Sequence, residues 1–529
     1  MKQTKIYTFL ALFLAVFIIS SCHKDLDKFP TNDLTADKVF VDLAGYKNAL
    51  SKLYVSLAVT GTNGRDIPSE IVSDEGNTGF IRQLWYLQSL TTDEGLWTWS
   101  GNTDPVNMHE MNWSSNSYVV AGLYFRCYYL IATANNFIAE SSDAKLAARG
   151  ITGADAEQVK QFRAEARFIR AFSYATLLDH FGAVPFTDEN YVIGSGVSPK
   201  QLSKQEIFSF VESELTAIDP DLVAPKTNEN GRADKAAAWA LLSRIYLNAN
   251  IYIGTPKYTE AIAASKKVID AGYTLHNDYT QLMLADNHTL VGSEFIWSIR
   301  FDATQTQSYS GTTFLVHGPS GVSGEVSGSN GSWNCIRITE DFVDKFNAAD
   351  IRGQFWTTGQ TKTVASLLGD PTSGYSSSKF RNVDRNGNVK PGSGNPFVDI
   401  DFPVFRLAEI YLNYAEAVMR GGTGGDNATA LNYLKALARR ARPTAGAAAD
   451  AVPTLTEDYL IDERGRELFW EGHRRTDLIR FGMFTTSKYL WDWKGNVRNG
   501  TAVDSKYNVF PIPSIDITSN PSINQNTGY

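Results

Sequence analysis

The sequence predicts a mainly α-helical protein that forms one continuous body, and three observations support this prediction. Apolar residues recur at three- and four-residue steps over long segments, which is the period of an amphipathic helix. No Pro/Ser-rich linker or low-complexity tract divides the 529 residues into independent units. With 43% apolar and 20% charged residues, the chain has the composition of a protein that buries a large core.

The expected helices come in pairs separated by short turns. Residues 232–250 place Ala, Trp, Leu and Tyr at helical spacing, and residues 258–272 repeat the pattern after a Gly/Pro turn. Residues 402–420 and 427–441 form a second pair around a Gly-rich loop, and residues 159–182 are the first helix of a third. The design resembles tetratricopeptide units, which stack because one pair cannot bury its own apolar face. We therefore expect repeat-like helical hairpins within a larger body.

Three stretches have little helical periodicity and are rich in Gly, Ser, Thr and Asn, roughly residues 60–118, 285–335 and 355–401. Long irregular segments within a compact domain are usually functional loops. Many of the tryptophans fall in them, namely Trp85, Trp97, Trp99, Trp113, Trp333 and Trp356.

The first 21 residues have the pattern of a secretory signal peptide, in which two lysines precede an apolar run that ends at Ile19. The run is too short for a comfortable membrane span. The small residues Ser20 and Ser21 before Cys22 resemble a bacterial lipobox, in which the cysteine is diacylated and becomes the first mature residue. The alternative is an ordinary cleavage site followed by an incidental cysteine.

This interpretation divides the chain into three parts. Residues 1–21 are the signal peptide, residues 22–40 are the lipidated cysteine and a polar tether, and residues 41–529 are a single domain. The net charge of −8 argues against a nucleic-acid partner, because phosphate binding needs a clustered positive face.

Two cysteines remain after processing, Cys127 and Cys335, and neither has metal-ligand spacing. Cys127 lies in an apolar helical run, so a buried thiol is the favoured interpretation. Pairing of the two thiols in an oxidising compartment stays open.

Motifs of common enzyme classes are absent from the sequence, which has no HEXXH, GXSXG or P-loop. The densest charged stretch, residues 461–482, places Glu463, Glu467 and Glu471 along one helical face among arginines. One interpretation is acid–base chemistry or a metal site around His473. The favoured one is a structural ion-pair network, because carboxylates surrounded by arginines stay ionised.

Asp399 and Asp401 form a DXD motif just before an expected helix, and Asp286 lies in the loop ADNH. Carboxylate oxygens at this spacing suit calcium. Helix caps or solvated loop aspartates are the favoured alternative, because a two-residue motif is a weak signal.

Trp97 and Trp99 lie one residue apart in the segment DEGLWTWSGN, residues 93–102. On an extended backbone the two indoles would point to the same face. Sugars suit such a surface, since their C–H faces pack on aromatic rings while their hydroxyls need polar partners. Core packing of at least one of the two rings is the alternative.

Five longer motifs occur in order along the chain: DLDKFP after the lipobox, RAEARFIRAFSYATLLDHFGAVPF, RLAEIYLNYAEA, ERGRELFWEGHRRTDLIRFG and the ending FPIPSIDITSNPSINQNTGY. Together they resemble the SusD/RagB family of outer-membrane nutrient-binding lipoproteins. The resemblance implies an α-helical fold on four tetratricopeptide-like hairpins and lipid-anchored display on the cell surface. It also implies that the protein covers the opening of a SusC-like TonB-dependent transporter. The SusD/RagB family is not an enzyme family.

Further motifs, including TTDEGLWTW, SYSGTTFLVHG and NGSWNC, are similar to those of the family's starch-binding founder. This similarity implies an arc of aromatic rings with polar neighbours. The implied ligand-binding residues are Arg82, Trp97, Asn102, Tyr309 and Trp333. In this assignment Trp97 faces the ligand and Trp99 is its structural partner.

The segment DIDFPVFR is similar to the calcium site of the same founder. It gives Asp399 and Asp401 as ligands, with Asp286 as the third. The loop ADNHTLVGSE, which carries Asp286, is shorter than the corresponding loop of the founder. We therefore expect no required cofactor, and the resemblance leaves a structural calcium ion open.

The sequence thus predicts a non-enzymatic surface lipoprotein that captures starch or maltooligosaccharides and passes them to a transporter. A relative tuned to another polysaccharide is the first alternative, because loop residues decide the ligand. A surface glycosidase is the less favoured alternative, since 57 acidic residues always allow a catalytic pair.

The lipobox generates a direct prediction. We expect Cys22→Ala to give a folded protein that no longer fractionates with membranes, because the acyl chains anchor the protein while the folded body needs no lipid. Membrane fractionation with mass spectrometry of the mature N-terminus checks this. A signal-cleaved variant that stays membrane-bound would contradict it.

Overall fold

The computed structural model describes residues 36–61, 71, 75–192, 194–389, 396–446 and 455–529. The predicted signal peptide and Cys22 lie outside the described residues.

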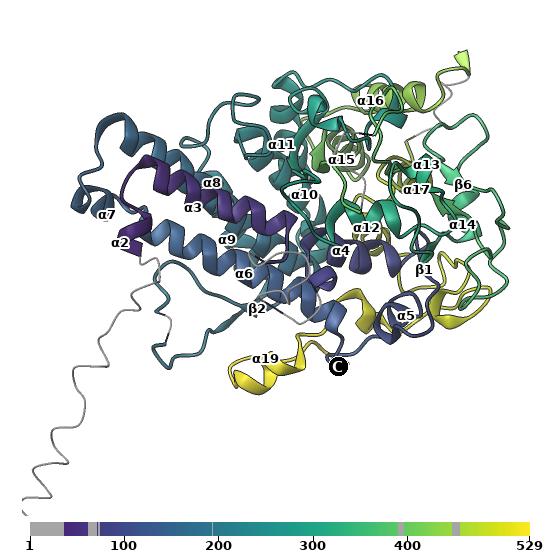
Figure 1. Ribbon diagram of the computed structural model, residues 1–529, viewed down its shortest axis with the longest axis horizontal. Helices are drawn as coiled ribbons and strands as arrows, with labels where there is room; N and C mark the ends of the chain where they lie inside the picture. Colours follow the sequence, from purple (N-terminus) through teal and green to yellow (C-terminus); the bar gives the residue numbers. More distant parts are fainter. Residues whose placement is uncertain (1–35, 62–70, 72–74, 193, 390–395, 447–454) are drawn as a thin grey trace, which may run out of the picture.

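The predicted helical hairpins are present and form a continuous stack (Figure 1). Long helices pack in chain order, each against the next: α3 (Leu43–Ala58), α6 (Tyr118–Glu140), α8 (Gly153–Phe181), α9 (Lys204–Ala217), α10 (Lys235–Ile253), α11 (Tyr258–Asp270), α15 (Leu407–Met419) and α16 (Asn427–Ala441). They make four pairs, α3–α6, α8–α9, α10–α11 and α15–α16. The prediction of a mainly helical fold on four tetratricopeptide-like hairpins is confirmed.

The ends of these helices follow from local sequence. Ser203 and Glu206 form a reciprocal capping box at the start of α9. At α10 the Asp234 carboxylate accepts two backbone N–H bonds, and the helix stops at Gly254, whose φ of 68° is in the left-handed region. The short turn that follows allows α11 to return antiparallel, which explains the hairpin.

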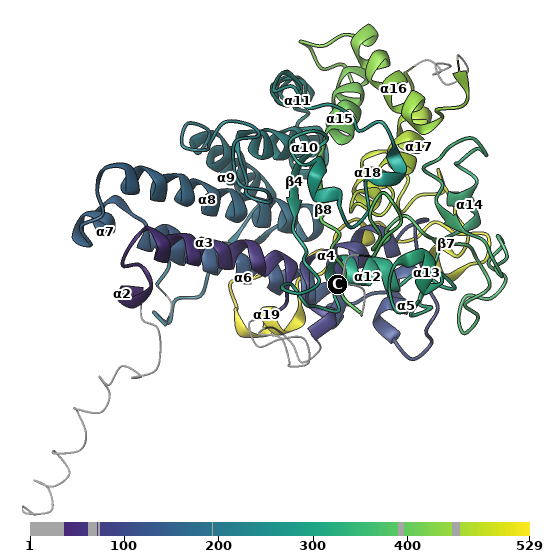
Figure 2. The same ribbon diagram turned by 45° about the horizontal axis from the view of Figure 1, so that its top comes forward.

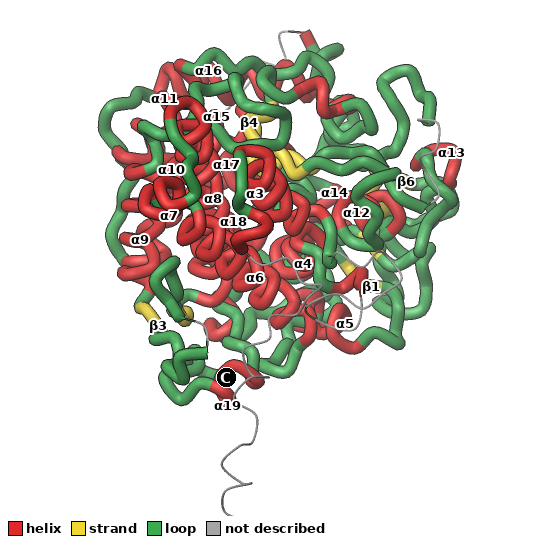
Figure 3. Tube along the Cα trace, turned by 60° about the vertical axis from the view of Figure 1, so that its left-hand side comes forward, coloured by secondary structure: helices red, strands yellow, loops and turns green. Residues whose placement is uncertain are grey.

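Long loops and most of the shorter elements cover one side of the helical stack, at the right of Figure 1, whereas the short helices at residues 36–39 and 143–148 lie at the left. In Figure 3 the loops are green and the helices are red. The short helices are α2 (Ala36–Val39), α4 (Phe80–Trp85), α5 (Thr103–His109), α7 (Asp143–Ala148), α12 (Gly311–His317), α13 (Gly324–Ser327), α14 (Glu340–Val343), α17 (Glu457–Glu467), α18 (Arg474–Arg480) and α19 (Ser514–Ser519). A π-helical turn, η2 (Tyr86–Leu90), continues α4. The stretch 60–118, expected to be irregular, therefore contains α4, η2 and α5.

In the part of the chain that the structure describes, the strands form four two-stranded antiparallel sheets. These are β1 (Leu96–Trp97) with β5 (Ile336–Arg337), β2 (Val184–Pro185) with β3 (Gln201–Leu202), β4 (Phe295–Ile299) with β8 (Phe402–Arg406), and β6 (Phe355–Trp356) with β7 (Ser376–Ser377). The expected helix at 402–420 begins only at Leu407, because the fully buried run before it pairs with β4. The DXD motif consequently precedes a strand and not a helix. Figure 2 shows β4 and β8 beside α10.

A buried ion-pair network joins the two sides of the molecule. Glu467, at the end of α17, accepts from Arg406 at 2.6 Å and from Arg352 at 3.0 Å, and it also pairs with Arg440. Although burial alone would raise it, these three guanidinium groups hold the pKa of Glu467 well below its usual value. The favoured interpretation of the stretch 461–482 is therefore confirmed.

The network extends on both sides of Glu467. Glu463 pairs with Arg352 at 2.7 Å, and Glu471 pairs with both Lys379 and Arg406 at 2.6 Å. Glu471 lies in the turn after α17, so the three glutamates share one cluster but not one helix. No group of three or more His, Cys, Asp or Glu side chains in the described part of the chain is arranged to hold a metal ion.

Both remaining cysteines are free, buried thiols. Cys127 lies in α6, and Cys335 donates to the carbonyl oxygen of Gly318 at 3.4 Å. Among the described helices, none combines the length and the apolar character needed to span a bilayer.

Removing one charge from the network should destabilise the fold strongly. We expect Glu467→Gln to lower the free energy of unfolding by about 3 kcal/mol or more, because three buried arginines lose their shared counter-ion. Urea unfolding followed by circular dichroism measures this. The matched control is Glu157→Gln, which breaks a pair with Lys160 in which the Glu157 and Lys160 side chains are 71% and 39% exposed, and which should cost under about 1 kcal/mol. Equal losses in the two variants would show that the network is not stabilising.

Candidate functional site

The predicted aromatic residues lie along a continuous series of ring contacts, here named the aromatic ladder. The ring centroids are separated by 5.5 Å from Trp99 to Trp97, 5.7 Å from Trp97 to Tyr86, 5.4 Å from Tyr86 to Phe314, 6.4 Å from Phe314 to Trp333 and 6.4 Å from Trp333 to Tyr309. These separations are typical of stabilising aromatic pairs. Residues from four separate chain segments are thereby joined into one structure.

The ladder is buried in the middle and accessible at its ends. Tyr86 and Phe314 have no exposed surface, whereas Tyr309 and Trp333 are half-buried. At the other end, Trp99 is 40% exposed. The ladder therefore presents aromatic rings to solvent at two places and supports them from within.

The assignments of Trp97 and Trp99 are corrected by this burial. Trp97 has 0% exposed surface because it lies in β1, opposite Ile336 of β5, with its ring edge-on to Tyr86. Its indole offers no face to a ligand. Trp99, predicted to be structural, carries the exposed ring and rests edge-on against Trp97 at an interplanar angle of 76°.

Arg82 contacts the buried middle of the ladder and its Tyr309 end. Its Nε donates to the Tyr86 hydroxyl at 3.0 Å, and its Nη1 donates to the backbone oxygen of Tyr309 at 3.4 Å. The guanidinium also lies 4.6 Å from the centroid of the Phe314 ring, a cation–π contact. Only 8% of Arg82 is exposed. Its guanidinium therefore holds the rings in place and leaves only a small part of its surface to solvent.

Asn102 lies at the start of α5, at the N-cap position, and is half-buried. Its side chain makes no capping hydrogen bond. Asn102 follows Trp99 by three residues in the same loop.

The Trp333 end is held by His317, which the sequence analysis did not identify. The imidazole stacks on the indole with centroids 5.0 Å apart and planes 12° apart. The His317 backbone oxygen accepts from the Trp333 N–H at 2.6 Å, and its Nδ1 and Nε2 lie 2.6 and 2.7 Å from the carbonyl oxygens of Gly331 and Pro396. The motif SYSGTTFLVHG contains both Phe314 and His317, so the sequence held this signal.

The three predicted calcium ligands, Asp286, Asp399 and Asp401, line one pocket of about 440 Å³. They are already engaged by protein groups. Asp286 pairs with Arg385 at 2.6 Å, and one oxygen each of Asp399 and Asp401 accepts from the backbone N–H of Ala303 and Phe301. Burial raises the pKa of Asp401 to about 7. The structure brings these carboxylates to one pocket without forming a ready set of metal ligands in the described residues.

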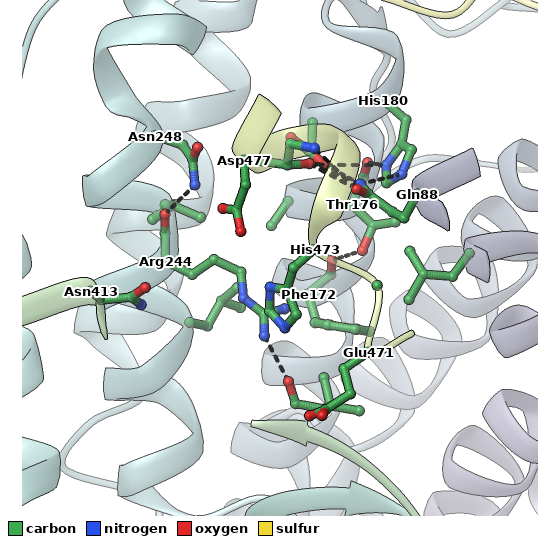
Figure 4. Close-up of a pocket in the computed structure, with 18 of the residues that line it drawn as sticks. Gln88, Phe172, Thr176, His180, Arg244, Asn248, Asn413, Glu471, His473 and Asp477 are labelled. Carbon is green, nitrogen blue, oxygen red and sulfur yellow. Dashed lines mark hydrogen bonds and ion pairs between the residues drawn. The ribbon is translucent and has the colours of Figure 1, made fainter. Parts of the chain in front are cut away.

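A small pocket of about 60 Å³ lies between α8, α10 and α18 (Figure 4). Arg244 and His473 both line it, and Gln88 contacts His180 and Thr476. Burial lowers the pKa of His473 well below its usual value, so its imidazole is neutral. This volume holds a few water molecules and is too small for a sugar ring.

Comparisons with known proteins agree with this architecture. A family model described as "SusD family" matches residues 352–529, and another described as "Starch-binding associating with outer membrane" matches residues 26–247. The chain is 35% identical to the starch-binding protein SusD of Bacteroides thetaiotaomicron, over 97% of this chain and 96% of that protein.

Two solved structures from Bacteroides thetaiotaomicron share the fold. A SusD homolog superposes with a TM-score of 0.73 at 21% identity, covering 93% of this chain and 98% of its own. A surface glycan-binding protein in complex with laminarihexaose superposes with a TM-score of 0.67 at 18% identity, covering 91% and 99%. The match along nearly the whole chain, together with the four helical pairs, establishes that this protein belongs to the SusD family.

Proposed function

We propose that the protein is a cell-surface glycan-binding protein that captures starch or maltooligosaccharides without cleaving them. The observation that carries this proposal is the aromatic ladder, whose accessible rings Trp99, Trp333 and Tyr309 lie beside the polar groups of Arg82 and Asn102. Aromatic faces take up the C–H surface of a sugar, while amide and guanidinium groups bond its hydroxyls. A support of buried rings keeps this surface preorganised, which reduces the entropy lost on binding.

The comparisons favour an α-glucan as the ligand. The relative that is 35% identical is a starch-binding protein, whereas the protein solved with laminarihexaose shares 18% identity and therefore supports the fold alone. A β-1,3-glucan is the second candidate. Affinity electrophoresis in gels containing amylopectin, laminarin, levan, xylan or mannan separates the two, and we expect retardation by amylopectin alone.

The ion pairs support binding over hydrolysis. Glu463 and Glu467, two of the residues considered for acid–base chemistry, are held ionised by buried arginines. The third, Glu471, is paired with Lys379 and Arg406. A reducing-end assay with amylose tests this part of the proposal directly, and release of new reducing ends would contradict it.

We also propose that Cys22 is lipidated, that the protein lies at the outer membrane and that it delivers its ligand to a TonB-dependent transporter. The family model that matches residues 26–247 is described as associating with the outer membrane, which supports this location. Copurification of the transporter with the tagged full-length protein from detergent-solubilised membranes tests the partner.

We expect substitution of Trp99 to reduce sugar binding and substitution of Trp97 to reduce stability. Trp99→Ala should weaken maltoheptaose binding at least thirtyfold, on the order of 2 kcal/mol, with little change in melting temperature, because the exposed ring is lost without a cavity. Trp97→Ala should instead lower the stability by about 3 kcal/mol or more, since it empties a fully buried site. Isothermal calorimetry and thermal unfolding measure both.

Trp333→Ala serves as the matched test of the other end and should also abolish binding, because Trp333 is the ring next to Tyr309. Normal binding by Trp99→Ala and Trp333→Ala would remove the ladder from the ligand site.

We propose that calcium, where it binds, is structural and does not take part in sugar recognition. Asp399 and Asp401 precede β8, and none of the ladder rings lines their pocket. We expect EDTA to leave the maltoheptaose affinity within about twofold, and any effect of calcium to show as a rise in melting temperature that Asp399→Asn abolishes. Loss of sugar binding in EDTA, restored by calcium, would overturn this.

A further inference from the structure

We infer that His109 is a positioning residue for the glycan surface, because it closes the base of the loop that presents Trp99 and Asn102. The inference rests on the proposed function. The contact that carries it is a hydrogen bond of 3.1 Å from the backbone N–H of Trp97 to Nδ1 of His109. Both residues are buried, Trp97 completely and His109 to 2% exposure.

The loop runs from β1 to the last residue of α5. On its first side, β1 pairs with β5, and the N–H of Thr98 donates to the Cys335 oxygen at 3.0 Å. On its second side, α5 begins after Asn102, whose carbonyl oxygen accepts from the Val106 N–H. His109, at the end of α5, returns to β1 and ties these two sides together.

The protonation state of His109 suits this role. Burial lowers its pKa to about 3, and the charge of Arg337 acts in the same direction. The imidazole is therefore neutral at ordinary pH, with its proton on Nε2 and the Nδ1 lone pair free to accept. Without that acceptor, the N–H of Trp97 would be buried with no partner, because β1 directs it away from β5.

The tip of the loop has little other support. Ser100 and Gly101 are exposed, and no heavy atom lies within 4 Å of a Cβ placed at Gly101. The Trp99 ring makes its ring contact with Trp97, and the Thr98 oxygen accepts from the Gly369 N–H at 2.9 Å. Because few contacts hold the tip itself, the angle between β1 and α5 sets where Trp99 and Asn102 point. His109 contributes to that angle by joining the end of α5 to β1, while Asp104 ties the start of α5 to α6 by accepting from the Tyr118 N–H.

Two substitutions at one position test the inference. His109→Asn retains a side-chain oxygen that accepts the Trp97 N–H, whereas His109→Phe keeps an aromatic ring without an acceptor. We expect His109→Phe to bind maltoheptaose at least tenfold more weakly than wild type and His109→Asn to bind within about threefold. In a Trp99→Ala background, His109→Phe should cause no further loss.

A buried histidine elsewhere provides the matched control. His180 in α8 is equally buried and contacts the Thr176 oxygen at 2.8 Å, and it lines the pocket of Figure 4 and not the ladder. His180→Phe should lower the melting temperature without changing the maltoheptaose affinity. Calorimetry and thermal unfolding on all variants separate affinity from stability.

Hydrogen exchange of peptides covering residues 93–110 gives a readout that needs no sugar. His109→Phe should speed exchange there, and His109→Asn should not. The inference is overturned by wild-type affinity and exchange in His109→Phe, or by equal losses in the Asn and Phe variants. A wild-type protein that binds none of the glycans would refute the proposed function, while the exchange data would still decide whether His109 closes the loop.

Discussion

The buried ion-pair cluster around Glu467 and Arg406 is the interaction on which the rest of the structure depends. Arg406 ends β8 and starts α15, Arg440 lies in α16, and Glu467 ends α17, so the cluster fixes the last helical hairpin to the loop-rich side. The attachment continues to the aromatic ladder. Asp93, in the segment before β1, accepts from Arg474 at 2.6 Å, and the backbone oxygen of Glu94 accepts from the Trp470 indole at 2.9 Å. The residues that precede Trp97 and Trp99 are thus anchored to the same charged interior.

Such a cluster adds little net free energy of folding, but it permits only packing arrangements in which its charges stay paired. Ions taken out of water lose hydration free energy, and their mutual attraction offsets that loss only when nearly every charge has a well-placed partner. Here Arg406 contacts Glu294, Glu467 and Glu471, and Glu294 also binds Arg440 at 2.6 Å. A shifted packing would leave at least one of these charges buried and unpaired, which is far more costly than a shifted apolar contact. The cluster therefore restricts the loop-rich side to one arrangement, although its segments contain little regular secondary structure.

Sequence periodicity predicted the parts of this molecule that local interactions determine. The helical pairs at 235–253 with 258–270 and 407–419 with 427–441 follow from apolar spacing and caps within each segment. The segment 402–406 was misassigned, because a short apolar run has no period of its own and is a strand only through pairing with residues 295–299. The prediction that Trp97 is exposed to ligand and Trp99 is structural was wrong for the same reason. The neighbours that bury Trp97 are Tyr86, Ile336 and His109, and no local pattern brings these residues to it.

The two ends of the aromatic ladder differ in how firmly they are built, and this difference bears on ligand choice. Trp333 stacks on His317, contacts Phe314 and Tyr309, and is bonded through its backbone, so its ring direction is fixed by several groups. Trp99 rests on one buried ring at the tip of a loop with open space around Gly101. Substitutions at that tip would change the shape offered to a sugar chain without disturbing the buried rings or the ion cluster beneath them. If the ladder binds glycan as proposed, such a scaffold allows the fold to remain constant while the glycan changes, because the Trp99 end is adjustable and the Trp333 end provides a fixed reference surface.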